Sequence, residues 1–273
     1  MTLLSPQGTA YDIGGPEIAP VVVLIHGLGL TRQTWADHLP ALAEHFRVLT
    51  YDLCGHGGSA LPSRIPSLAV LSDQLRDLMD HLELSSAALI GFSLGGMINR
   101  RFAMNHPDRV SALVILNSPH ERSPEAQRLV EERAAQSDAG PAATIEATLD
   151  RWFTPSFRAN HPEAVARVRA SVLANDPGNF ARHRHVLARG VTELIRPEPP
   201  ITQPTLVMTC ENDTGSTPGM SRALAAEIPG AQVRIVPALQ HLGLIEQPGF
   251  FTTPITDFLR QVLAQSKNKR TTS

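Results

Sequence analysis

This 273-residue sequence has few cysteines, few aromatic residues and almost no net charge. It contains 2 cysteines and 5% aromatic residues, and its 24 basic and 26 acidic side chains leave a formal charge of -2 at pH 7. Two cysteines cannot form a disulfide framework, and a balanced charge provides no positive field for a phosphate backbone. We therefore expect Cys54 and Cys210 to be free thiols and nucleic acid not to be a partner.

Long apolar runs are also absent. No uninterrupted run approaches the roughly 18 residues that a membrane-spanning helix needs. The stretch from Met1 to Gly15 has no basic head followed by an apolar core, as a secretory signal would have. The sequence therefore predicts a cytoplasmic protein with no membrane partner, and it leaves the oligomeric state open.

Short apolar runs rich in branched residues recur between helical stretches. Six of them read as buried strands: Val21 to Ile25, Arg47 to Tyr51, Ala87 to Ile90, Ala112 to Leu116, Thr205 to Met208 and Val233 to Val236. Apolar residues at helical spacing fill 68–82 and 97–104. This alternation predicts an α/β fold with a mostly parallel central sheet flanked by helices.

The strand pattern stops for about eighty residues after Ser118, where helical sequence broken by prolines replaces it. We interpret residues 119–200 as a helical cap inserted into a core made of 1–118 and 201–265. The alternative is a second helical domain with its own function. The polar residues 266–273 are expected to form a disordered tail.

The most specific motif is Gly91-Phe92-Ser93-Leu94-Gly95, which follows a predicted strand and begins a predicted helix. It matches the nucleophile elbow G-x-S-x-G in its strand-to-helix context. The sharp turn exposes the serine hydroxyl, and glycine lets neighbouring backbone approach closely. We therefore predict that Ser93 is a catalytic nucleophile, although a plain Gly-Ser turn remains the alternative.

A serine nucleophile needs a base and an acid, and in the fold that carries this elbow the three follow along the chain in the order serine, acid, histidine. Asp213 lies just beyond the run ending at Met208, and His241 is the only histidine after His185. We predict Asp213 as the acid and His241 as the general base. Glu211 is the alternative acid, and a helix cap is the alternative role for Asp213.

An oxyanion intermediate needs backbone N–H donors, one from the residue after the nucleophile and one from a loop after an early strand. These positions are Leu94 and, in His26-Gly27-Leu28-Gly29, Leu28. We expect His26 to brace this loop. Asp52 and His56 sit in a glycine-rich turn that a structural role explains without chemistry.

Other polar and aromatic residues carry weaker signals. Cys54 and Cys210 occupy no elbow, and His183 and His185, two residues apart, do not share a helix face, so we expect a solvated cap helix rather than a metal site. No metal or cofactor is expected. Trp35, Trp152 and Phe153 are candidates for the pocket wall or for the core.

The motifs around His26-Gly27, 91–96 and His241 together resemble the α/β-hydrolase superfamily over nearly the whole chain. Within it, the segments 151–157 and 246–248 are similar to those of 3-oxoadipate enol-lactonases. The resemblance implies hydrolysis of a small ester or lactone, with Ser93, Asp213 and His241 as the triad. The Arg- and His-rich stretch 179–188 departs from that group and puts the substrate in question.

Several functions use the same triad on this fold. We predict a serine esterase or lactonase for a small-molecule substrate, and keep as alternatives a C–C bond hydrolase, a cofactor-free perhydrolase and a low-turnover ligand-binding protein. An acidic lactone would require a cation, because a guanidinium group binds carboxylate bidentately. The candidates in the cap are Arg133, Arg151, Arg158 and Arg182.

Overall fold

An eight-stranded sheet forms the centre of the fold. The computed structural model describes residues 2–136 and 140–271. The strand order is β1-β2-β4-β3-β5-β6-β7-β8, with every pairing from β4 to β8 parallel and β1 and β2 antiparallel to their neighbours. The strands are β1 (Leu3–Leu4), β2 (Ala10–Gly14), β3 (Val21–Ile25), β4 (Arg47–Tyr51), β5 (Ala87–Phe92), β6 (Val110–Leu116), β7 (Thr205–Cys210) and β8 (Gln232–Val236).

The six predicted strands are confirmed as β3 to β8, and the mostly parallel sheet with them. The ends of β5 to β8 extend one or two residues beyond the apolar runs, because pairing with a neighbouring strand holds residues that hydropathy alone does not mark. The sequence analysis missed β1 and β2. Both are short, and the two residues of β1 are exposed, so neither produces an apolar run.

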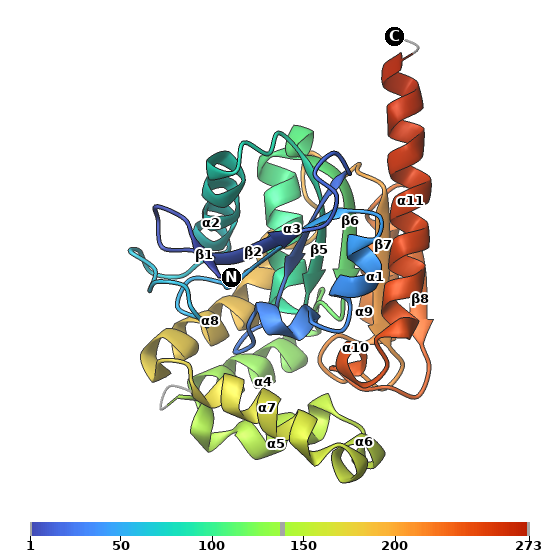
Figure 1. Ribbon diagram of the computed structural model, residues 1–273. Helices are drawn as coiled ribbons and strands as arrows, with labels where there is room; N and C mark the ends of the chain where they lie inside the picture. The colour runs from blue at the N-terminus through green and yellow to red at the C-terminus, as the bar shows by residue number, and fades with distance from the viewer. Residues whose placement is uncertain (1, 137–139, 272–273) are drawn as a thin grey trace.

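Helices cover both faces of the sheet. The two predicted crossover helices are α2 (Leu68–His81), capped by the Ser67 side chain, and α3 (Leu94–Asn105). They pack together on one side, whereas α1 (Leu39–Ala43) and α11 (Gly249–Thr271) lie on the other (Figure 1). Two more, α9 (Pro218–Ala226) and α10 (Gly243–Glu246), follow β7 and β8.

The segment interpreted as a cap consists of helices grouped beyond one end of the sheet (Figure 1). They are α4 (Pro124–Ala135), α5 (Ile145–Trp152), α6 (Pro155–Asn160), α7 (Pro162–Leu173) and α8 (Pro177–Arg189). Four of these helices begin with proline, which suits a first position whose N–H has no partner in the helix. We keep the division into core and cap as a proposal.

The C-terminal helix α11 continues to Thr271, whereas the sequence led us to expect a frayed tail from Ser266. The helix that begins at Gly249 runs on through these polar residues, and residues 272–273 lie outside the described part of the chain. In the ranges that the structure describes, no helix combines the length and the apolar character needed to cross a membrane.

The start of α3 is packed backbone to backbone against the end of β3. A Cβ atom added at Gly95 would lie 2.1 Å from the carbonyl oxygen of Ile25, and one added at Gly91 would lie 2.2 Å from that of Gly95. Neither carbonyl belongs to a side chain that could rotate away. Glycine at these positions is therefore a packing requirement of the turn between β5 and α3.

We predict that Gly95→Ala destabilises the protein by about 3 kcal/mol or more, because the new methyl group must displace the β3 backbone. Urea unfolding followed by circular dichroism measures the change. Gly219→Ala in α9 is the matched control, since the nearest atom to its new Cβ would be 3.7 Å away. Equal stability of the two variants would contradict the packing requirement.

Candidate active site

Ser93 occupies a strained turn between β5 and α3. Its backbone has φ 55° and ψ -112°, a left-handed conformation that is rare for residues with a side chain. The residue is 6% exposed, and its side chain lines a cavity. Backbone strain of this kind persists only where surrounding packing holds it, and the contacts of Gly91 and Gly95 supply that packing.

Three side chains from separate loops form a continuous chain of hydrogen-bond contacts. The Nε2 atom of His241 lies 3.2 Å from the Ser93 hydroxyl, and its Nδ1 atom lies 2.7 Å from Oδ2 of Asp213. Ser93 follows β5, Asp213 follows β7 and His241 follows β8. The structure thus brings together the three residues that the sequence analysis selected, at one edge of the sheet.

Asp213 is buried and receives several hydrogen bonds. The amides of Gly215 and Ser216 donate to its Oδ1 at 2.9 Å each, and the Asn117 side chain donates to Oδ2 at 2.9 Å. Burial alone would raise the pKa of Asp213, but the charge of His241 and these donors together lower it below its ordinary value. Asp213 is therefore a carboxylate at neutral pH.

Asn117 is a site residue that the sequence analysis missed. It directly follows β6 and adopts a positive φ of 45°. An asparagine just beyond the carboxyl end of a parallel strand was the available signal. Glu211, the alternative acid, is exposed and accepts a hydrogen bond from the Ala238 amide instead.

The loop after β3 lies against the serine. A Cβ added at Gly27 would be 3.2 Å from Cβ of Ser93. The Leu53 amide donates to Nε2 of His26 at 2.9 Å, so the proton of this neutral ring is on Nδ1, which donates to the Gly27 carbonyl at 2.8 Å. The trans peptide then directs the Leu28 N–H away from His26.

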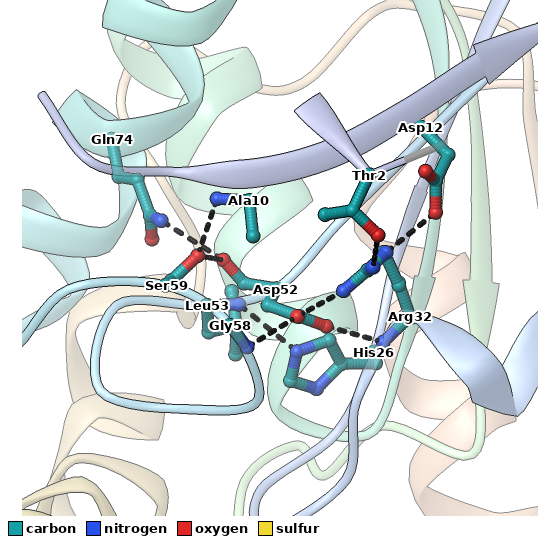
Figure 2. A network of polar contacts seen from close by, with 10 residues as sticks. All are labelled: Thr2, Ala10, Asp12, His26, Arg32, Asp52, Leu53, Gly58, Ser59 and Gln74. Carbon is teal, nitrogen blue, oxygen red and sulfur yellow. Dashed lines mark hydrogen bonds and ion pairs between the residues drawn. The ribbon is translucent and has the colours of Figure 1, made fainter. Parts of the chain in front are cut away.

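Asp52 is at the centre of a polar network that joins the loops after β3 and β4 (Figure 2). It is fully buried, and it accepts from the backbone amides of Arg32 at 2.7 Å and Gly58 at 2.8 Å. The Arg32 guanidinium contacts Asp52 and also Asp12, where Nε to Oδ2 is 2.6 Å. These contacts give Asp52 a bracing role, distinct from the Ser93 site.

Three buried histidines meet where the cap touches the core. The rings of His26 and His56 are 5.5 Å apart between centroids, and those of His56 and His183 are 4.8 Å apart. The expectation of a solvated helix is wrong for His183, because α8 packs this side chain onto the loop after β4. The described residues contain no group of three or more His, Cys, Asp or Glu side chains placed to hold a metal ion.

Both cysteines are buried and free. Burial raises the pKa of Cys54 to about 11 and that of Cys210 to about 12. Because the thiolate is the reactive form, both thiols are poor nucleophiles at neutral pH.

The cavity at Ser93 has a volume of about 120 Å³ and lies between core and cap. Its core lining includes Ser93, Asp213 and His241, and its cap lining includes Trp152. The ring centroid of Trp152 is 6.0 Å from that of His241. Four arginines also line it: Arg122, Arg133, Arg151 and Arg184.

Two of the three aromatic candidates for the pocket wall lie elsewhere. Trp35 is 1% exposed and Phe153 is fully buried, and neither lines the cavity. Phe153 stacks on Phe157 within the cap, so its burial serves packing. Of the two roles that the sequence left open for Trp35 and Phe153, pocket wall or core, the structure gives both residues the second.

The arginine candidates divide in the same way. Arg133 and Arg151 line the cavity, whereas Arg158 pairs with Asp150 and Arg182 is exposed at another surface depression. Arg122 and Arg184 were missed. Arg122 lies in the segment before α4, which has no periodic pattern, and helical spacing does not show which face of α8 meets the core.

The sheet, the elbow and the Ser93 cavity define a hydrolase of the alpha/beta type, and comparison with known families agrees. The family model described as alpha/beta hydrolase fold matches residues 20–248. The chain belongs to this family and is a hydrolase.

Similar proteins have more specific names. A putative carbamate hydrolase RutD of Stutzerimonas stutzeri is 29% identical over 93% of this chain and 98% of its own length. The 3-oxoadipate enol-lactonase 2 of Acinetobacter baylyi is 26% identical over 92% of each protein. The crystal structure of an enol-lactonase from Burkholderia xenovorans LB400 has a TM-score of 0.83 and 32% identity, covering 92% of this chain and 96% of that one.

We predict that acid destabilises the protein through its histidine cluster. Burial, partly offset by the Asp52 charge, lowers the pKa of His26 to about 4, and burial also lowers the pKa of His56 and His183. Unfolded histidines titrate near 6.5, so this stability is present above that pH and is lost as the pH falls toward about 4. His26 contributes a slope of about 1.4 kcal/mol per pH unit within this window, and His56 and His183 add to the loss in the same direction.

Urea unfolding at pH 7 and at pH 5 measures the effect. The variant His183→Asn should flatten the dependence, whereas replacing the exposed His161 by glutamine should not. An unchanged slope in His183→Asn would show that the cluster is not the cause.

Proposed function

We propose that this protein is a serine hydrolase that cleaves a small carboxylic ester or lactone through an acyl-enzyme. Ser93 is the nucleophile, His241 is the general base and Asp213 orients the histidine. The observation that carries the proposal is the unbroken path of contacts from Asp213 through His241 to the Ser93 hydroxyl. Such a path is what a serine hydroxyl needs in order to lose its proton during attack.

The first step forms the acyl-enzyme. Oγ of Ser93 attacks the substrate carbonyl carbon while its proton passes to Nε2 of His241. The bond to the leaving oxygen then breaks, and the protonated His241 returns the proton to that oxygen. Asp213, a carboxylate beside Nδ1, keeps the ring in the tautomer whose Nε2 accepts from serine and stabilises the imidazolium.

The amides of Leu28 and Leu94 are the proposed oxyanion donors. Leu94 is the first residue of α3, where backbone N–H groups have no partner within the helix. The Leu28 peptide follows Gly27, where an added Cβ would lie 3.2 Å from Cβ of Ser93 and whose carbonyl accepts from Nδ1 of His26. These local environments support the two amides as donors to the oxygen of the carbonyl that Ser93 would attack.

The second step releases the acid. A water molecule loses its proton to Nε2 of His241 and attacks the acyl carbon, and the bond to Oγ of Ser93 breaks as the serine regains a proton from His241. This sequence consumes one water and regenerates the enzyme. A lactone gives a single hydroxy or keto acid, because its leaving oxygen stays attached.

The relatives named enol-lactonase support a lactone, and those named carbamate hydrolase make a carbamate the second candidate. Both bonds break by the same attack at an acyl carbon. The Leu28-Gly29-Leu30 loop is apolar, which disfavours C–C cleavage of a diketone. A perhydrolase and a low-turnover binding protein remain alternatives that sustained hydrolytic turnover would exclude.

We expect Ser93→Ala to lower kcat for 4-nitrophenyl butyrate by about 10⁴-fold or more, and Asp213→Asn to lower it by about 10³- to 10⁴-fold. The first change removes the attacking oxygen, and the second removes the charge that holds the His241 tautomer. Steady-state kinetics measure both effects, with circular dichroism to verify folding.

The matched control is Glu211→Gln, which alters the alternative acid in the same loop. It should retain activity close to that of the parent. A large loss in Glu211→Gln together with a small loss in Asp213→Asn would exchange the roles, and normal turnover in folded Ser93→Ala would overturn the mechanism.

A further inference from the structure

The core side of the cavity at Ser93 carries neutral side chains and one carboxylate that is already hydrogen-bonded, whereas its cap side carries arginines. Its core lining carries the triad, in which Asp213 is the carboxylate. Both oxygens of Asp213 are already bonded, Oδ1 to two amides and Oδ2 to His241 and Asn117. The arginines that line the cap side come from the segment before α4, from α4, from α5 and from α8.

Arg184 is the least compensated of these arginines. It is half-buried, and its guanidinium group makes no hydrogen bond or ion pair with any residue in 2–136 or 140–271. Burial, together with the charges of Arg151 and Arg133, lowers the pKa of Arg184 to about 10. The group therefore stays charged at neutral pH despite its surroundings.

Arg151 is in a similar state. Its guanidinium donates to the neutral Thr148 hydroxyl at 3.3 Å, and the neighbouring Asp150 carboxylate is engaged by Arg158. Burial and the charge of Arg133 lower the pKa of Arg151. Two guanidinium groups, from α5 and α8, thus line one small cavity, and neither is bound to a carboxylate of residues 2–136 or 140–271.

Holding like charges together in a partly desolvated cavity destabilises the empty protein. An arginine at the surface avoids this cost because water solvates its charge. A buried arginine with a purely structural role avoids it because a hydrogen-bond acceptor pairs with its guanidinium group. Guanidinium groups bind carboxylate and phosphate oxygens in paired hydrogen bonds, which are strong where water is excluded. An anionic ligand would therefore relieve the repulsion between the two arginines.

We propose that the cap selects a substrate with two negative charges at neutral pH, held by Arg151 and Arg184, while its ester or lactone carbonyl lies at Ser93. The substrate class is an ester or lactone of a polycarboxylic or phosphorylated acid. This inference rests on the proposed function for the chemistry at Ser93. The anion recognition is independent of that chemistry.

The test uses 4-nitrophenyl esters that share one leaving group and differ in acyl charge. The butyrate ester has no charged group in its acyl part, the glutarate monoester has one free carboxylate, the tricarballylate monoester has two, and the phosphonopropionate ester has a dianionic phosphonate. We expect kcat/KM to rise about tenfold or more with each added charge. Whichever of the two dianionic esters has the higher kcat/KM shows whether the site prefers two carboxylates or one phosphonate group.

In Arg184→Met, kcat/KM for the doubly charged esters should fall about tenfold or more relative to that for the neutral ester, so that the gain from the second charge is lost. Arg182→Met, on the exposed face of the same helix, is the matched control and should behave as the parent. Because the change removes an uncompensated cation, we expect Tm of Arg184→Met to be equal to or above that of the parent. Equal kcat/KM for the singly and doubly charged esters would overturn the two-charge proposal, as would an equal loss on all esters in Arg184→Met.

A binding measurement separates this proposal from the proposed function. Titration calorimetry of tricarballylate into Ser93→Ala should show binding that weakens about tenfold or more when Arg184→Met is added. If the parent hydrolyses no ester but this binding is seen, the chemistry at Ser93 fails and the anion site stands. If esters are hydrolysed but tricarballylate does not bind, the anion site fails alone.

Discussion

The site depends on close backbone contact between β3 and the turn that carries Ser93. A Cβ atom at Gly95 would collide with the Ile25 carbonyl, and one at Gly27 would lie 3.2 Å from Cβ of Ser93. Because neither position has room for a side chain, the turn that carries Ser93 and the loop after β3 pack closely and keep one relative position. The strained backbone of Ser93 and the proposed oxyanion donors depend on this contact.

The buried charges around that contact differ in whether they have a partner of opposite charge or a set of hydrogen-bond donors. In the core, Asp52 is neutralised by Arg32 and backbone amides, and Asp213 is held by its donors and His241. In the cap, Arg151 and Arg184 face the cavity with no such partner among the described residues. The paired carboxylates hold the core loops in one geometry, whereas the two cap arginines are stabilised only when an anionic ligand binds to them.

Strong local patterns in the sequence predicted the strands of the core and selected Ser93, Asp213 and His241, whose side chains lie in contact in the structure. Six apolar runs marked β3 to β8, and the elbow motif identified Ser93 because strand, glycines and helix occur together. The roles of Trp35 and Phe153 were not predictable, since burial in a core and burial at a pocket give the same residue types. His183 was expected to be solvated, because the sequence does not show which side of α8 packs onto the core. Arg184 was missed for a related reason: its importance comes from which side of α8 meets Ser93, and that depends on tertiary packing.

Hydrogen bonds of two kinds join the cap to the segment that follows His241. The Leu242 amide donates to the Trp152 carbonyl at 2.8 Å, and the Glu246 carboxylate accepts from the amide of Thr154 at 2.8 Å and from its hydroxyl at 2.6 Å. The first uses main-chain atoms only. Side chains such as that of Arg151, next to Trp152, can therefore be exchanged without loosening this connection. Mutations of cap side chains can thus change which ligand the cap recognises while the loops that carry Ser93, Asp213 and His241 keep their positions. The cap is therefore the part of the chain where new substrate specificities can evolve or be engineered.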